Sequence, residues 1–202
     1  MKVMVAYVSR SGSTREIAAR LAAGLEGAGH AVTLLPAAEV SDLDGYDAVV
    51  AGGFLYRLGW HPELTRFLRR HRAALKEKKT ALFVCGLRLT PGAAQEREAF
   101  PVFVDPALLP PAGERPGLTG WLTTFRGYLG PVLPLVREIA PAGMAFFAGS
   151  LQVFTLTPLE RVTAILLMGL TGIQPGDHRR WESVDAWAAQ LAELLTHPRP
   201  LP

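Results

Sequence analysis

A short run of hydroxyl residues around one glycine is the feature of this sequence best suited to chemistry. It is Ser9-Arg10-Ser11-Gly12-Ser13-Thr14, and it follows an apolar segment at 2–8. Such a loop at the start of a helix can surround a phosphate with backbone N–H groups and hydroxyls, aided by the helix dipole. Gly12 allows close backbone approach or a positive φ. The loop predicts a phosphate site; the alternative is a serine-rich turn in which Ser13 or Thr14 caps the helix.

Other motifs for phosphate or metal do not fit. Gly27-Ala28-Gly29-His30 is similar to the start of a dinucleotide fingerprint, but it follows a predicted helix and precedes a predicted strand. The sequence has no P-loop lysine pattern and no nucleophile elbow. His, Cys, Asp and Glu residues do not cluster at metal-ligand spacings, so we expect no metal.

The charge balance argues against one class of partner. The formal net charge is +3 and the sequence pI is about 9.3, but the arginines are dispersed and form no stripe with aromatic residues. We therefore expect no nucleic acid as a partner. The mild positive charge is compatible with an anionic substrate or an anionic membrane surface.

Strands and helices alternate around the loop. Apolar runs predict strands at 2–8, 31–35, 46–52, 80–86 and 143–151, and amphipathic patterns predict helices at 14–28, 62–75 and 183–195, with another starting at Thr157-Pro158-Leu159-Glu160. This alternation implies right-handed crossovers and a parallel sheet. We expect an α/β fold, a doubly wound five-stranded parallel sheet with helices on both faces. The phosphate loop would lie at its carboxyl edge, and Cys85, Trp181 and Trp187 in the core.

A proline-rich segment interrupts the alternation at residues 87–140, after the fourth strand. We interpret it as a long insertion with one short helix near 118–128, which governs substrate binding or, alternatively, folds onto the domain as extra core. The chain is expected to be a single domain over 1–196, with a disordered tail at 197–202. The single cysteine and the lack of a signal-peptide pattern predict a cytoplasmic protein.

The phosphate loop resembles the FMN phosphate loop of the flavodoxin family, with Ser11 where threonine is usual. Residues 46–53, Trp60-His61-Pro62 and the late run Gly176-Asp177-His178-Arg179-Arg180-Trp181-Glu182 resemble one branch of it, which includes the menaquinone-dependent protoporphyrinogen dehydrogenase. The likeness covers about residues 1–90 and 141–196. It implies a flavodoxin-like fold with FMN as cofactor.

The resemblance also implies which residues contact the flavin. The expected FMN-binding residues are Ser9, Arg10, Ser11, Gly12, Ser13 and Thr14 at the phosphate, and Gly53, Phe54, Tyr56, Trp60, Gly86, Leu87 and Arg88 beside the ring. Trp60 or Tyr56 could stack on the flavin, and the alternative for Trp60 is packing on the insertion. His61 is interpreted as a residue at a helix start or as a proton acceptor for substrate.

The function implied by the resemblance is an FMN-dependent oxidoreductase that passes electrons from a porphyrinogen-like substrate to a quinone. Arg57, His61 and Arg179 are the candidate substrate-binding residues, because arginines can meet carboxylates in bidentate pairs. The alternative for Arg179 is a structural pair with Asp177. The quinone would place the protein at the cytoplasmic face of a membrane, in peripheral contact. The other functions left open are a flavodoxin-type electron carrier and an NAD(P)H-dependent quinone or flavin reductase.

Overall fold

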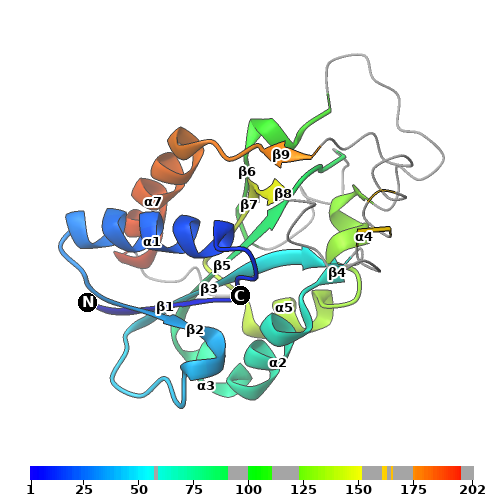
Figure 1. Ribbon diagram of the computed structural model, residues 1–202. Helices are drawn as coiled ribbons and strands as arrows, with labels where there is room; N and C mark the ends of the chain where they lie inside the picture. Colours follow the sequence, from blue (N-terminus) through cyan, green and yellow to red (C-terminus); the bar gives the residue numbers. More distant parts are fainter. Residues whose placement is uncertain are drawn as a thin grey trace.

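The computed structural model describes residues 1–56, 59–90, 100–110, 123–151, 161–162, 165 and 175–196. Its strands are β1 (Lys2–Tyr7), β2 (Ala31–Pro36), β3 (Ala48–Tyr56), β4 (Gly59–Trp60), β5 (Lys79–Gly86), β6 (Val102–Val104), β7 (Gly143–Ala148), β8 (Ser150–Leu151) and β9 (Gly176–Asp177). Its helices are α1 (Ser13–Gly27), α2 (Pro62–Arg70), α3 (Arg72–Glu77), α4 (Phe125–Leu129), α5 (Leu133–Ile139) and α7 (Trp181–Thr196), with short 3-10 turns η1 (Ala37–Glu39) and η3 (Pro106–Leu108). Figure 1 shows the helices on both sides of one central sheet.

The strand order confirms the predicted fold class. In the described part of the chain the main sheet runs β2-β1-β3-β5-β7-β6, and every neighbouring pair in this order is parallel. Helices α1 and α7 cover one face of the sheet, and α2, α3 and α5 lie on the other (Figure 1). All five expected strands are present. Two short strands add to them, because β4 pairs antiparallel with the end of β3 and β6 extends the sheet beyond β7.

Alternation along each strand divides the core into two layers. On β1, Val3 and Val5 pack with α1 and α7, whereas Met4 and Ala6 pack with the helices of the opposite face. This follows from the period of two in a strand, which sends successive side chains to opposite faces. Trp187 of α7 is 1% exposed in the first layer, as the sequence predicts.

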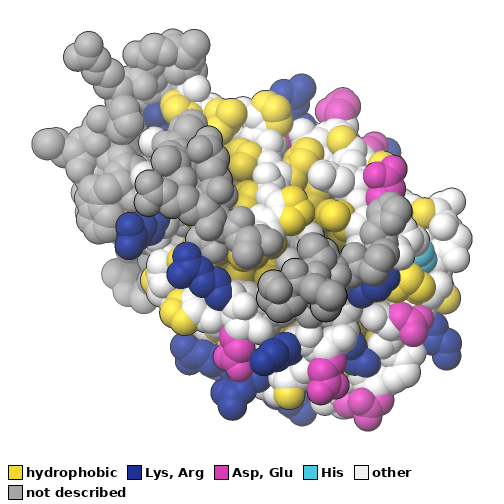
Figure 2. All heavy atoms as spheres, turned by 180° about the vertical axis from the view of Figure 1, so that it is seen from behind, with side chains coloured by type: hydrophobic (Ala, Val, Ile, Leu, Met, Phe, Trp, Pro, Cys, Tyr) yellow, Lys and Arg dark blue, Asp and Glu magenta, His cyan; other side chains and the backbone are white. Residues whose placement is uncertain are grey.

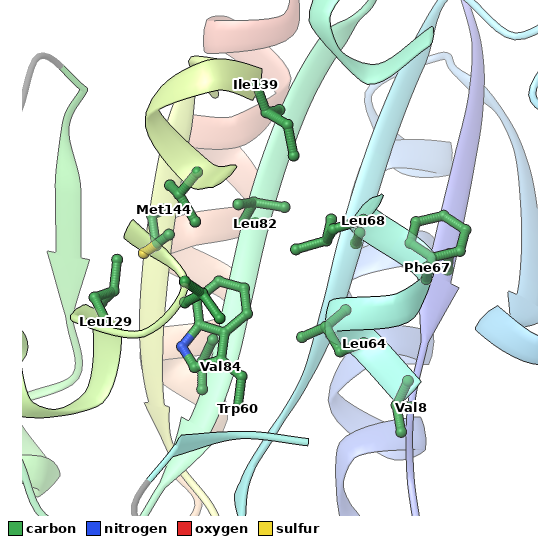
Figure 3. Close-up of a cluster of buried hydrophobic side chains, with 14 of the residues drawn as sticks. Val8, Trp60, Leu64, Phe67, Leu68, Leu82, Val84, Leu129, Ile139 and Met144 are labelled. Atoms are coloured by element: carbon green, nitrogen blue, oxygen red, sulfur yellow. The ribbon is translucent and has the colours of Figure 1, made fainter. Parts of the chain in front are cut away.

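The second layer anchors the chain segment that follows β3. Figure 3 shows Leu64 and Leu68 of α2 in one cluster with Val84 of β5, and with Trp60 and Leu129. The apolar residues of α2 recur at helical spacing, so one side of the helix is buried and the other carries charge. Packing of this side against β3, where Leu64 lies close to Gly53, fixes the start of α2 at the carboxyl edge of the sheet.

The sequence prediction is corrected at one strand end, one helix and one core residue. Strand β3 continues to Tyr56, four residues past the expected end at 52, because its last residues pair with β4. The helix predicted at 62–75 is divided into α2 and α3, since His71 turns inward, with its ring 4.9 Å from that of Phe67 and only 8% exposed. Trp181 was expected in the core, and this is wrong: it begins α7 and is 36% exposed.

The described part of the insertion is largely extra core. It contains β6, η3, α4 and α5, and its buried apolar residues join the second layer: Phe100, Leu108, Phe125, Tyr128, Leu129, Val132, Val136 and Ile139. The helix expected near 118–128 is observed as α4, five residues long and starting at Phe125. Residues 91–99 and 111–122, most of the helix expected after Thr157, and the tail at 197–202 lie outside the described residues.

Candidate functional site

The phosphate loop lies between β1 and α1, as predicted. Helix α1 begins at Ser13, and Gly12 before it has φ 93° and ψ −26°, the left-handed region that glycine tolerates. The serine-rich cap is wrong, because Gly12 occupies the N-cap position and α1 has no side-chain cap within the described residues. The first-turn N–H groups, which a helix leaves without partners, therefore keep their capacity to bind an anion.

The hydroxyls of the loop differ in what they contact. Ser9 Oγ is buried and has no hydrogen-bond partner among the described residues. The Thr14 side chain is 2% exposed and hydrogen-bonds the Cys85 thiol, while Arg10 and Ser11 are exposed at the tip of the loop. A buried hydroxyl without a partner is costly, so Ser9 is the loop hydroxyl most in need of a ligand.

The carboxyl ends of three neighbouring strands bring the other candidate segments to this loop. Strand β1 pairs with β3, and β3 pairs with β5, with Phe54 opposite Cys85. Just past β1, Val8 N donates to Gly52 O at 2.9 Å. The loops after β1, β3 and β5 therefore share one edge, where ligands of doubly wound sheets bind.

Three aromatic rings gather where β3 ends. The Phe54 ring centroid lies 4.8 Å from that of His61, and the Tyr56 centroid lies 5.5 Å from it. Phe54 and Tyr56 are also in an edge contact at 6.4 Å. All three side chains are half-buried. Their faces give the edge an aromatic surface of the kind on which a planar ring can stack.

Trp60 does not belong to this surface. It is 6% exposed and lies in the second core layer, beside Val84 and Leu129 in Figure 3. Its strand β4 contacts α4, so Trp60 packs on the insertion, the alternative that the sequence left open. Tyr56 thus remains the better candidate for stacking on a flavin.

His61 acts as the N-cap of α2. Its Nδ1 accepts a hydrogen bond from Glu63 N at 3.4 Å. Burial lowers the pKa of His61, and the positive charges of Arg10 and Arg66 lower it further, against the opposing effect of Glu63. The imidazole is therefore neutral at pH 7, as capping requires.

The glycines expected beside the ring have packing roles. A Cβ on Gly53 would lie 3.0 Å from Leu64 Cδ2, and one on Gly86 would lie 2.9 Å from Leu55 Cδ1. The Gly86 carbonyl accepts from Gly149 N at 2.7 Å. A side chain at either position would require the neighbouring leucine to shift. Leu87 and Arg88, which follow, are half-buried.

Cys85 is a core residue, as predicted. It is 4% exposed, and burial raises the pKa of its thiol to about 12. A thiol with such a pKa is protonated at pH 7 and is a poor nucleophile.

Arg179 joins the start of α7 to the start of α1. Its Nε and Nη2 donate to Asp177 Oδ1 and Oδ2 at 2.8 and 2.6 Å, and its Nη1 donates to Glu16 Oε2 at 2.7 Å. The guanidinium also lies 5.0 Å from the Trp181 ring centroid. The predicted pair with Asp177 is present. Arg57, another substrate candidate, lies outside the described residues.

A family model described as a flavodoxin domain matches residues 4–109, more than half of the chain. The chain belongs to the flavodoxin domain family. Among proteins with curated functions, none matches it. Solved structures that resemble it include a flavodoxin from the domain Archaea, at 14% identity, a TM-score of 0.50 and coverage of 98% of this chain and 100% of that one. Another is a cysteine-to-alanine mutant of a flavodoxin from Pseudomonas aeruginosa, at 16% identity, a TM-score of 0.52 and the same coverage.

The loop of this flavodoxin domain fits the phosphate of FMN. The left-handed Gly12, the uncapped start of α1 and the unpartnered Ser9 hydroxyl together offer backbone and side-chain donors to an anion. FMN is therefore the cofactor, and Ser9 to Thr14 stay the residues predicted to hold its phosphate. When bound, FMN supplies the redox chemistry, and the protein supplies position and electrostatics.

Sequence reasoning missed two parts of the flavodoxin site. Glu16, in the first turn of α1, bonds Arg179 across 163 positions of sequence. The antiparallel β8–β9 pair lies next to Gly149, which follows β7 and donates to Gly86 O at the end of β5. An acidic residue in a first turn is ordinary for any helix, and neither strand of β8–β9 is longer than two residues, so the sequence carries no distinct signal for either.

Proposed function

We propose that this flavodoxin domain is an FMN-dependent oxidoreductase of the protoporphyrinogen dehydrogenase kind, which passes electrons from a porphyrinogen-like substrate through FMN to a quinone. The observation that carries the proposal is the pairing of Thr90, near the start of the insertion, with Thr123 further along it. Their hydroxyl oxygens lie 2.7 Å apart, and Thr90 N donates to Thr123 O at 2.8 Å.

This pairing supports an enzyme more than a carrier. Thr90 lies four residues past the end of β5, at the sheet edge where the flavin ring is expected. Both threonines are buried, at 7% and 2% exposure, so the contact fixes the insertion beside that edge. An insertion beside this edge would shelter a small substrate at the flavin from water. An electron carrier, in contrast, needs the edge of its flavin exposed to a protein partner.

Positive charge at the same edge supports an anionic substrate. Arg10 is exposed on the phosphate loop, and Arg88 is half-buried two residues past β5. The positive charge of Arg88 also acts on Tyr128 of α4, whose pKa burial raises to about 12. Arginines placed in this way can hold carboxylates in bidentate hydrogen bonds. Arg57 stays a prediction, and Arg179 is already engaged by two carboxylates.

The quinone part of the proposal draws on the surface of α2 and α3. Exposed cationic side chains gather there: Arg66, Arg69, Arg70, Arg72 and Lys76. Figure 2 shows Lys and Arg side chains, interspersed with Asp and Glu, along the lower part of one face and hydrophobic side chains in its middle. Basic residues are attracted to anionic lipid headgroups, so we propose peripheral contact with the cytoplasmic face of a quinone-containing membrane. No helix among the described residues is long and apolar enough to cross a membrane.

The test is an anaerobic assay of FMN-loaded protein with protoporphyrinogen as donor and a menaquinone analogue as acceptor. We expect turnover that needs both compounds, and a higher KM for the donor in Arg88→Gln. Arg69→Gln removes the same charge from the outer side of α2 and should leave that KM unchanged. Absence of turnover with rapid reduction by NAD(P)H would favour a reductase instead, and absence of both would favour a carrier.

A further inference from the structure

A carboxylate stands beside the phosphate loop, where a flavin phosphate would meet it. The Glu16 side chain reaches back over the loop, so that its Oε1 would lie 3.8 Å from a Cβ placed on Gly12. Glu16 N also donates to Gly12 O at 3.0 Å, which closes the first turn of α1. A carboxylate in this place and a phosphate bound by the loop would repel each other.

Arg179 is placed to offset this repulsion. Its Nη1 holds Glu16 Oε2 at 2.7 Å, and its side chain is only 12% exposed, against 59% for Glu16. Asp177 accepts two hydrogen bonds from the other edge of the guanidinium, and this bidentate pair fixes the orientation of the cation. The hydrogen bonds to both carboxylates raise the pKa of Arg179, so its charge is permanent.

One cation serves two carboxylates in this cluster, which therefore keeps a net negative charge. Glu16 is the carboxylate nearer the loop, because it belongs to the first turn of α1. The positive charge of Arg179 also reaches the Cys85 thiol, which hydrogen-bonds Thr14 of the loop. Through its hydrogen bond to Glu16, whose Oε1 lies over Gly12, the guanidinium is placed beside the loop, where its charge can act on a bound anion.

We propose that Arg179 is a positioning residue for the flavin phosphate: by holding Glu16 and offsetting part of its negative charge, it lets the loop accept a phosphate dianion and so prefer FMN over riboflavin. The inference rests on FMN binding at this loop. The phosphate is the only difference between FMN and riboflavin, so the ratio of their affinities isolates the effect of Arg179 from any general loss of structure.

The chain offers a matched control on the same two helices. Arg20 lies one turn further along α1 and makes a two-bond pair with Asp185 of α7, at 2.6 and 2.8 Å. Arg20→Gln breaks an arginine–carboxylate tie between α1 and α7 and removes the same charge, but it does so away from the loop. A role of Arg179 in merely joining the helices would make the two variants behave alike.

The experiment titrates apoprotein with FMN and with riboflavin at low ionic strength, by quenching of flavin fluorescence, because salt screens exposed charges. We expect Arg179→Gln to weaken FMN by about 10-fold or more and riboflavin by less than about twofold, as for the loss of one charge-assisted interaction. The double variant Glu16→Gln/Arg179→Gln should recover most of the FMN affinity. Arg20→Gln should change neither affinity.

Three results would overturn the inference. These are an equal loss of both flavins in Arg179→Gln, the same loss in Arg20→Gln, and failure of Glu16→Gln to restore FMN binding. Glu16→Gln alone decides the matter if Arg179→Gln does not fold: we expect a higher preference for FMN, and an unchanged or lower preference contradicts the proposal. Wild-type protein that binds neither flavin would contradict the FMN assignment itself.

Discussion

The hydroxyl of Ser183, at the start of α7, donates to the buried carboxylate of Asp105 at 3.0 Å, across 78 positions of sequence. Asp105 lies in the insertion and is 0% exposed. It also accepts from Ala107 N at 3.0 Å and from Ala148 N, at the end of β7, at 3.2 Å. One side chain therefore ties the insertion, the sheet and the last helix together.

We expect Asp105→Ala to lower the free energy of unfolding by about 3 kcal/mol or more, because it leaves three donors without an acceptor, and those of Ser183 and Ala148 are buried. Ser183→Ala removes one of the three bonds and should cost about 1.5 kcal/mol. Urea unfolding followed by circular dichroism measures both. Equal stability of Asp105→Ala and wild type would show that this carboxylate does not join the insertion to the body.

The role of the insertion could not be predicted from the sequence. Its apolar residues and prolines were visible, but whether they covered a substrate or filled the core depended on contacts with distant segments. Asp105 and Thr90 make such contacts, with Ser183 and Thr123. The structure favours extra core for the described part, while its proposed role at the flavin edge stays a prediction. Deletion of residues 87–140 is thus expected to unfold the domain.

The phosphate loop, in contrast, could be predicted because its residues are consecutive and the strand before it and the helix after it have clear patterns. The arrangement of Arg179 with Glu16 could not, since nothing in the sequence links positions 163 apart. Trp181 was misplaced, and the two alternatives for Trp60 were left open, for a related reason. Trp60 ends the two-residue strand β4, and Trp181 begins helix α7. At the end of an element, the spacing of apolar residues does not show which side chain is buried.

Gly52 leaves room for an aromatic ring, and this gives a prediction on stability. A Cβ at Gly52 would collide with the Phe83 ring, which is fully buried between β5 and α7. Gly52→Ala should therefore destabilise the fold by about 1–3 kcal/mol through overpacking. Gly59→Ala is the matched control in β4, because a Cβ there meets nothing within 4 Å. Thermal unfolding should separate the two variants clearly.

Stability should fall as the pH drops from 7 to 5. Burial lowers the pKa of His30, His61 and His71 below the ordinary value of 6.5, so each is neutral in the fold and takes up a proton more readily when unfolded. The stabilisation is complete above about pH 6.5 and is lost below it. Asp177 and Asp185, whose pKa values are lowered from 3.8, act only at more acidic pH.

His30 offers the cleanest variant for this effect, since both ring nitrogens are buried without a partner among the described residues. His30→Phe keeps an aromatic ring and removes the titration. Urea midpoints measured at pH 5, 6 and 7 should show a shallower pH dependence for His30→Phe than for wild type. Parallel curves for the two proteins would rule His30 out as a contributor.

Ser9→Ala should weaken FMN binding without lowering the stability of the apoprotein. Ser9→Ala removes a buried hydroxyl that has no partner among the described residues, so the apoprotein should be as stable as wild type or more so. FMN should bind about 10-fold more weakly, because the phosphate loses a charge-assisted hydrogen bond. Unchanged FMN affinity would show that this hydroxyl does not face the phosphate.

The two aromatic candidates for the flavin ring should respond differently to substitution. Tyr56 is half-buried in the cluster with Phe54 and His61, whereas Trp60 is 6% exposed in the core layer that includes Val84. Tyr56→Ala should weaken FMN and shift the flavin midpoint potential with little loss of stability, because it removes a stacking surface. Trp60→Ala should instead cost about 3–5 kcal/mol of unfolding free energy, as for other large core truncations. Trp60→Phe keeps much of the core volume and should leave both the flavin affinity and the potential near wild type. A shift of the potential in Trp60→Phe together with none in Tyr56→Ala would place the ring against Trp60 and reverse this assignment.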